Sequence, residues 1–189
     1  MANKYLIALG ASAGGLAALA EFFDHTLPDA VSYVITTHLY PHQKSMLSEI
    51  IQRHSSLEVC EVENDMTIQP NIIYVMPENK VMSINNGSLI LTERDLSIKL
   101  NMAIDIFFNS LAADTTFKKI AVILSGMGED GTKGVKMIAK AGGYIIAQIP
   151  ESAAEDSMPI SVIISGYADE ILSPKQMPQA IMDYVKRSP

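Results

Sequence analysis

Apolar residues follow two different periods along the first third of the chain. Short apolar runs at 5–10 and 31–39, the second rich in β-branched residues, are typical of buried strands. The stretches 15–27 and 42–54 instead repeat apolar residues at helical spacing. This β–α–β–α order predicts a parallel sheet with helices on both of its faces.

The pattern changes between residues 57 and 93, where short strand patterns alternate with turns. Asn86-Gly87 lies between two such strands and is a strong signal for a hairpin. We therefore expect an antiparallel insertion at about 57–93. Beyond it the alternation resumes, with a buried strand at 119–126 and a closing helix from about Pro174. The whole chain, 1–189, is predicted to form one doubly wound α/β domain with a mostly parallel sheet.

Composition excludes several classes of function. The net charge is −7 and Lys and Arg form no block, which argues against a nucleic-acid partner because phosphate binding needs clustered cations. The single cysteine, Cys60, excludes an intrachain disulfide and argues against a zinc cluster. No apolar run reaches membrane-spanning length, and the N-terminus lacks a signal-peptide pattern. We expect a soluble cytoplasmic protein that is not inserted in a membrane and uses no cofactor or metal.

The first strand is followed by Gly10-Ala11-Ser12-Ala13-Gly14-Gly15. In a dinucleotide-binding loop, a glycine should stand where Ser12 stands, so that a pyrophosphate can approach the backbone. The same residues fit the motif G-x-S-x-G, which forms a tight strand-to-helix turn that exposes a nucleophilic serine. Serine is also a favoured helix N-cap. The motif alone leaves nucleophile and cap open for Ser12.

His38 follows the second predicted strand, next to the strand that leads to Ser12. A nucleophilic serine needs a neighbouring base, and imidazole is the usual one because it titrates near neutrality. The other three histidines are less suited: His25 and His54 lie at predicted helix ends, and His42 lies beyond a proline. His38 is therefore the candidate base.

Asp130 lies in the glycine-rich stretch that follows the predicted strand 119–126. As an isolated aspartate before a helix it would be an N-cap, whereas as a third catalytic residue it would orient the histidine. Glu129 is the competing carboxylate and is expected to face solvent. Because ligands gather at the carboxyl ends of parallel strands, Ser12, His38 and Asp130 are predicted to converge there.

With these residues in place, the chain resembles the catalytic domain of the CheB protein-glutamate methylesterase family over nearly its whole length. The resemblance is carried by "IALGASAGGLAAL", "THLYPHQKSMLSEII", "IIYVMPENK", "VILSGMGEDGTKGVKMIAKAGG" and "AQIPESAAEDSMPISVI". Three stretches, "GASAGGL", "LSEIIQRHSS" and "AIDIFFNSLA", look most like the form found in fusions with CheR-type methyltransferase and sensor-kinase modules.

The resemblance implies a serine esterase that hydrolyses glutamate γ-methyl esters on chemoreceptor-type proteins and, in some members, deamidates glutamine. It implies that Ser12, His38 and Asp130 are catalytic. It also implies that the substrate carbonyl lies near Ala13, Gly14, Met127 and Gly128, and that CheR-type or sensor-kinase modules are partners.

Three departures from the family pattern limit this inference. Ala13 stands where family esterases commonly have threonine, and the "KLNMAID" segment before Asp105 lacks the usual Arg-Pro-Ser. The receiver domain that normally precedes the catalytic domain is also missing from this sequence. The alternative is therefore a non-catalytic CheB-like module that binds partners in a larger signalling protein. Mononucleotide binding at the glycine-rich turn is a third hypothesis, disfavoured by Ser12 and His38.

Overall fold

The computed structural model describes residues 4–38 and 46–187. Its strands are rich in aliphatic and β-branched residues, and β1 and β2 are buried along their entire lengths. The strands are β1 (Tyr5–Ala11), β2 (Val31–Thr37), β3 (Glu58–Glu61), β4 (Met66–Thr67), β5 (Ile72–Val75), β6 (Lys80–Asn85), β7 (Ser88–Glu93), β8 (Lys118–Ile123), β9 (Tyr144–Gln148) and β10 (Glu170–Leu172).

The helices connect these strands and cover the sheet. They are α1 (Gly15–Phe23), α3 (Leu47–His54), α4 (Ala103–Ala113), α5 (Thr132–Lys140), α6 (Ser157–Ser165) and α7 (Met177–Arg187), with short 3₁₀ turns η1 (Pro150–Ser152) and η2 (Pro174–Gln176). The predicted helix at 15–27 ends earlier than expected, at Phe23. The first part of the predicted helix 42–54 lies outside the described residues.

In the described part of the chain, seven parallel strands form one sheet in the order β10-β9-β8-β1-β2-β5-β3. From β1 the chain first adds strands on one side and later, from β8, on the other. The strand order therefore reverses between β1 and β8, which is the switch point at which open α/β sheets bind ligands.

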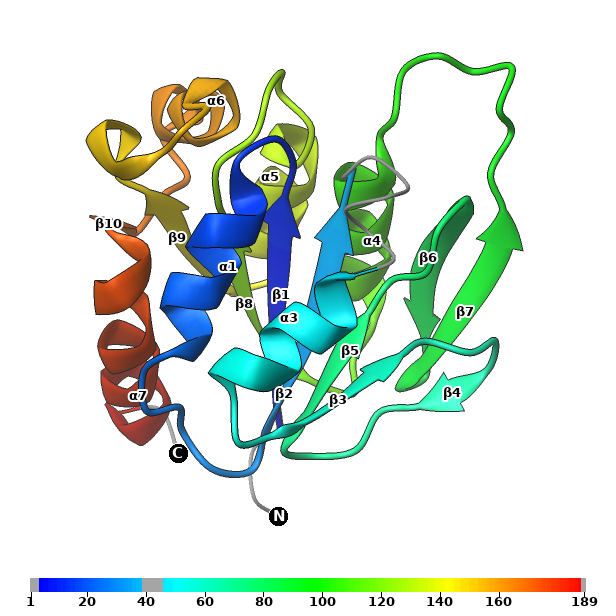
Figure 1. The fold of residues 1–189 in the computed structure, drawn as a ribbon, viewed down its shortest axis with the longest axis horizontal. Helices are drawn as coiled ribbons and strands as arrows, with labels where there is room; N and C mark the ends of the chain where they lie inside the picture. Colours follow the sequence, from blue (N-terminus) through cyan, green and yellow to red (C-terminus); the bar gives the residue numbers. More distant parts are fainter. Residues whose placement is uncertain (1–3, 39–45, 188–189) are drawn as a thin grey trace.

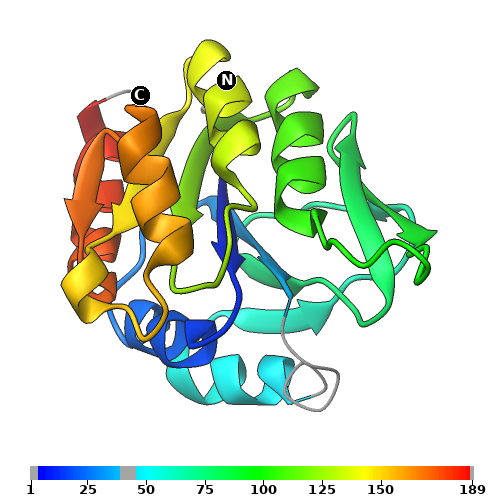
Figure 2. The ribbon, with the colours of Figure 1, turned by 90° about the horizontal axis from the view of Figure 1, so that it is seen from above.

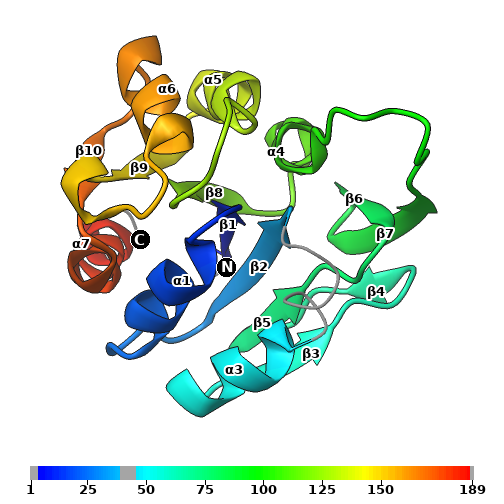
Figure 3. The same ribbon diagram turned by 45° about the horizontal axis from the view of Figure 1, so that its top comes forward.

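Helices lie on both faces of the sheet, as Figures 1 and 3 show: α1, α3 and α7 on one face, and α4, α5 and α6 on the other. Successive residues of β1 point to opposite faces. Ile7 and Leu9 pack with α1, α3 and α7, whereas Leu6 and Ala8 pack with α4, α5 and α6. The view from above in Figure 2 shows the sheet edge-on between the two helical layers. This confirms the predicted doubly wound fold.

The predicted insertion at about 57–93 has two parts in the structure. β4, β6 and β7 form a separate antiparallel sheet, and its β6–β7 hairpin turns at Asn86 and Gly87, which both have positive φ as a type I′ turn requires. The prediction was wrong for β3 and β5, because both pair in parallel with the main sheet. Strands this short carry no sequence pattern that distinguishes parallel from antiparallel pairing. Their pairing is set by contacts with segments distant in sequence.

Among the described residues, no helix combines the length and the apolar character that crossing a membrane requires.

Candidate active site

Ser12 lies at the carboxyl end of β1, in a turn that only small residues permit. Gly14 has φ 73°, a left-handed conformation that favours glycine, and a Cβ on Gly15 would lie 2.6 Å from the Cβ of Ala11. The turn closes when the Gly15 N–H donates to the Ser12 carbonyl at 2.8 Å. Gly14, not Ser12, is the N-cap of α1, and no side chain caps that helix. The cap interpretation of Ser12 is therefore wrong.

The Ser12 side chain is 8% exposed, and within residues 4–38 and 46–187 its hydroxyl makes no hydrogen bond. The backbone around it is held by Ser125, at the end of β8. The Ser12 N–H donates to the Ser125 carbonyl at 2.9 Å, and the Ser125 hydroxyl donates to the Ala13 carbonyl at 2.8 Å. Buried Gln148 accepts from the Ser125 N–H in turn. The turn that carries Ser12 is thus fixed to the neighbouring strand, and among the described residues nothing bonds to the Ser12 hydroxyl.

His38 follows β2, directly beside Ser12. The parallel register of β1 and β2 ends with the pair Ala11 and Thr37, so Ser12 and His38 are the next residues on adjacent strands. The His38 N–H also donates to the Ala11 carbonyl at 3.2 Å. Adjacent strands lie about 4.8 Å apart, so the register brings the two side chains to the same point of the sheet edge.

The His38 ring is bonded to Asp130. Its Nε2 lies 2.5 Å from Asp130 Oδ2, and the two side chains are 13% and 4% exposed. Of the other histidines, His54 contacts Asp24 at the surface and His25 is exposed. His42 lies outside the described residues. The choice of His38 among the described histidines is therefore supported by its contact with a buried carboxylate.

Asp130 is held by the N-terminus of α4. Its Oδ2 accepts the Ile104 N–H at 2.9 Å, and its Oδ1 accepts the Asp105 and Gly131 N–H groups at 2.8 and 2.9 Å. The residue at the N-cap of α4, Met102, offers no side-chain cap, so Asp130 performs that role from a distant loop. The positive end of the α4 dipole and these donors stabilise the carboxylate charge.

The structure does not support Asp130 as the N-cap of α5. That position belongs to Gly131, with φ 96° and no side-chain cap bond. Glu129 is exposed, as expected. Asp130 therefore caps α4 and contacts His38. It does not cap α5, the helix that directly follows it and that the sequence suggested.

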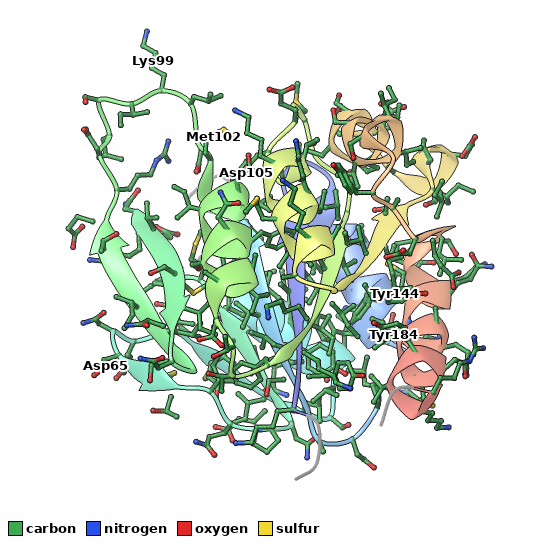
Figure 4. All side chains as sticks on the ribbon, turned by 180° about the vertical axis from the view of Figure 1, so that it is seen from behind. Asp65, Lys99, Met102, Asp105, Tyr144 and Tyr184 are labelled. Carbon is green, nitrogen blue, oxygen red and sulfur yellow. The ribbon has the colours of Figure 1, made fainter. Side chains whose placement is uncertain are left out.

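Asp105 is a second buried carboxyl group beside Asp130, and its role was not recognised from the sequence. It is 4% exposed, its Oδ1 accepts the Gly134 N–H at 2.7 Å, and its Oδ2 has no hydrogen-bond partner within the described chain. Burial, followed by the negative charge of Asp130, raises the pKa of Asp105 to about 6. Figure 4 shows Asp105 in the first turn of α4, below Met102. The sequence signal that could have identified Asp105 is an acidic residue on an otherwise apolar face of the predicted helix.

The four residues expected near a substrate carbonyl lie in the two loops that flank Ser12. Gly14 and Gly128 have positive φ, and Met127 is exposed. In the described part of the chain, the backbone N–H groups of Ala13, Gly14, Met127 and Gly128 donate to no protein acceptor. These N–H groups are thus free to bind a ligand oxygen.

The arrangement brings together a free buried hydroxyl, an adjacent imidazole, a buried carboxylate and unbonded N–H donors. These are the parts that acyl transfer by a serine nucleophile requires. Within the described residues, no group of three or more His, Cys, Asp or Glu side chains is placed to hold a metal ion. Cys60 lies in β3, where burial raises the pKa of its thiol above the ordinary value.

Comparison with known proteins agrees with this geometry. The CheB methylesterase family model matches residues 7–181. A protein-glutamate methylesterase/protein-glutamine glutaminase of Bacillus licheniformis is 36% identical over 98% of this chain and 54% of its own length. An uncharacterised 104.1 kDa protein of Rhodobacter capsulatus is 36% identical over 76% of this chain, which corresponds to 15% of that protein.

A solved structure is also similar throughout. The crystal structure of the Thermotoga maritima CheB methylesterase catalytic domain superposes with a TM-score of 0.86 at 30% identity, covering 96% of this chain and 99% of that one. The chain spans about half the length of the curated methylesterases it matches. From the extent of the family match, the sequence identity and the shared fold, the chain belongs to the CheB methylesterase family.

Proposed function

We propose that this chain is a serine esterase that hydrolyses glutamate γ-methyl esters on chemoreceptor-type signalling proteins, with Ser12 as nucleophile, His38 as base and Asp130 as orienting carboxylate. The observation that carries the proposal is the His38–Asp130 pair, 2.5 Å apart, at the strand end beside Ser12. In acyl transfer, a buried imidazole–carboxylate pair next to a serine activates the serine hydroxyl as a nucleophile.

The proton transfers follow from which ring nitrogen faces Asp130. Because the carboxylate accepts from Nε2–H, the lone pair of the neutral ring of His38 is on Nδ1. Nδ1 then removes the proton of Ser12 as its Oγ attacks the ester carbonyl. This is the reverse of the ring orientation in the chymotrypsin triad, where Nε2 serves the serine, but the chemistry is the same.

The negative charge on the carbonyl oxygen of the tetrahedral intermediate needs donors that are already in place. The free N–H groups of Ala13 and Gly14, at the start of α1, and those of Met127 and Gly128 on the facing loop supply them. His38 then protonates the leaving methoxide, which departs as methanol. A water activated by the same nitrogen hydrolyses the acyl-enzyme.

The substrate class rests on the family and on the relatives' names. Relatives named protein-glutamate methylesterase/protein-glutamine glutaminase support both ester hydrolysis and deamidation, in which ammonia replaces methanol as leaving group. A cytoplasmic location and partnership with CheR-type or sensor-kinase modules stay predictions. The 104.1 kDa relative shows that a similar segment occurs inside a much larger polypeptide.

The test is methanol release from a chemoreceptor cytoplasmic fragment carrying radiolabelled methyl esters. The wild-type protein should release methanol, and Ser12→Ala and His38→Ala should each lower kcat by roughly a millionfold, the scale seen for triad residues. Glu129→Gln serves as the control because Glu129 is exposed and its side chain takes no part in the proton transfer. Methanol release by Ser12→Ala at an undiminished rate would refute the assignment.

Failure of the wild-type protein to label with a fluorophosphonate would favour the alternative of a non-catalytic partner-binding module. A module that only binds partners needs no activated hydroxyl, so its Ser12 would stay unmodified.

A further inference from the structure

The segment 94–102, which we call the apolar arm, joins β7 to α4 and carries three large aliphatic side chains in solvent. Leu96, Ile98 and Leu100 are 69%, 57% and 71% exposed. Figure 1 shows this segment arching above the rest of the molecule, and Figure 4 shows Lys99 at its crest. Single exposed apolar residues are common, but three within five residues indicate a binding surface.

The arm has a defined conformation. Its first residue is tied to the body by the Arg94 N–H, which donates to the Asn79 carbonyl at 3.1 Å. Asp95 forms a local turn, accepting the Ser97 N–H at 2.9 Å on its side chain and the Ile98 N–H at 3.2 Å on its carbonyl. These bonds present the aliphatic side chains outward, and none of the three packs against either hydrophobic core.

The arm ends beside the candidate active site. At its end, Asn101 accepts the Ala103 N–H, and the next two N–H groups, of Ile104 and Asp105, hold Asp130. Met127, three residues before Asp130, is also 62% exposed. The arm therefore leads directly into the helix terminus that holds Asp130, the partner of His38.

The charge of the arm is opposite to that of the protein. It contains Arg94 and Lys99 against one acid, Asp95, for a net charge of +1, whereas the whole chain carries −7. A cation among aliphatic side chains suits a partner that presents acidic and apolar residues together. Such a surface is found on an amphipathic helix with glutamates beside its apolar stripe.

We propose that the apolar arm binds the substrate protein, receiving the apolar stripe of a glutamate-rich helix so that an esterified glutamate on that helix reaches Ser12. This inference rests on the proposed function. Recognition is then separated from chemistry: the arm contributes to KM for a protein substrate but makes no contact with a small ester.

The experiment compares two substrates of one enzyme. A triple variant, Leu96→Ser with Ile98→Ser and Leu100→Ser, is assayed with p-nitrophenyl acetate and with the methylated chemoreceptor fragment. Removing apolar contacts of this size should raise KM for the fragment on the order of 10- to 100-fold. The kcat for both substrates and all constants for the small ester should stay unchanged, which also shows that the variant is folded.

Two further variants sharpen the result. Met137→Ser with Ile171→Ser removes two exposed apolar side chains, 42% and 43% exposed, from α5 and β10, and should leave KM for the fragment unchanged. Lys99→Glu should raise KM for the fragment several-fold at low salt, and Lys99→Arg should restore it.

The outcomes are distinguishable. An unchanged KM for the fragment in the triple variant overturns the proposal, as does a change from dimer to monomer in sedimentation, which would make the arm a contact between two copies. If the wild-type protein hydrolyses p-nitrophenyl acetate but not the fragment, the substrate class and the arm proposal both fall. If it hydrolyses neither, the proposed esterase itself is wrong.

Discussion

Replacing Asp130 with asparagine exchanges one oxygen of a buried side chain for an NH₂ group. In the structure the carboxylate accepts four hydrogen bonds, two on each oxygen: from His38 Nε2 and the Ile104 N–H, and from the Asp105 and Gly131 N–H groups. An amide keeps a single acceptor oxygen. If the amide nitrogen replaces Oδ1, the Asp105 and Gly131 N–H groups both lose their acceptor. If it replaces Oδ2, the Ile104 N–H loses its acceptor, whereas the His38 ring can instead accept from the amide.

The expected loss follows from these contacts. Each buried donor left without an acceptor costs about 1–3 kcal/mol, so the orientation with the amide nitrogen toward His38, which leaves only the Ile104 N–H unpaired, is favoured. Asp130→Asn should then lower the free energy of unfolding by about 1–3 kcal/mol. In that orientation the ring must accept on Nε2 and carry its proton on Nδ1. Such a ring cannot remove a proton from Ser12, and kcat should fall by roughly 10⁴, as in other triads that lose the correct tautomer.

Urea denaturation followed by circular dichroism measures the stability, and p-nitrophenyl acetate hydrolysis measures kcat. Asp114→Asn is the matched control, because Asp114 is also buried but accepts only one N–H on each oxygen, from Gly87 and Thr116. It should lose a similar amount of stability, about 1–3 kcal/mol, and keep its kcat. An Asp130→Asn protein with less than about 1 kcal/mol of destabilisation, or with more than a tenth of the wild-type kcat, would refute this account of the site.

Three further predictions concern the surroundings of the site. Ser125→Ala removes the hydroxyl that holds the Ala13 carbonyl, so kcat should fall more than KM rises, as steady-state kinetics will show. Gly131→Ala places a Cβ on a residue with φ 96°, which should cost about 1–2 kcal/mol in urea denaturation. Asp105, with its pKa raised to about 6, binds its proton more tightly in the folded chain, so its contribution to stability falls as pH rises from about 4 to above 6. Asp105→Asn cannot ionise, so its stability relative to wild type should rise between pH 4 and pH 7, measured by urea denaturation at both pH values.

The elements and residues predicted best were those specified by local pattern. Alternating and continuous apolar runs identified β1 and β2, and glycines marked the turn that holds Ser12. The doubly wound topology then required the ends of β1, β2 and β8 to share one edge, which is why Ser12, His38 and Asp130 were chosen together.

The features that sequence reasoning missed depend on contacts between distant segments. Asp130 caps α4 although it lies 26 residues after Ile104 in the sequence, so no local capping motif indicates the interaction. The hydroxyl of Ser125 reaches Ala13 between the ends of the adjacent strands β8 and β1, and Asp105 contacts Gly134 on α5, which packs against α4. Likewise, β3 and β5 join the main sheet through parallel pairing, which short strand patterns do not specify.

The central claim is that the Ser12 hydroxyl is activated by His38 held on Asp130. Incubating the protein with a fluorophosphonate and mapping the adduct by peptide mass spectrometry tests this claim directly, whatever the natural substrate. The account predicts one phosphonyl group per chain, located on Ser12, and labelling slowed by several orders of magnitude in His38→Ala. Unmodified Ser12 in wild-type protein, or equal labelling rates in the two proteins, would contradict it.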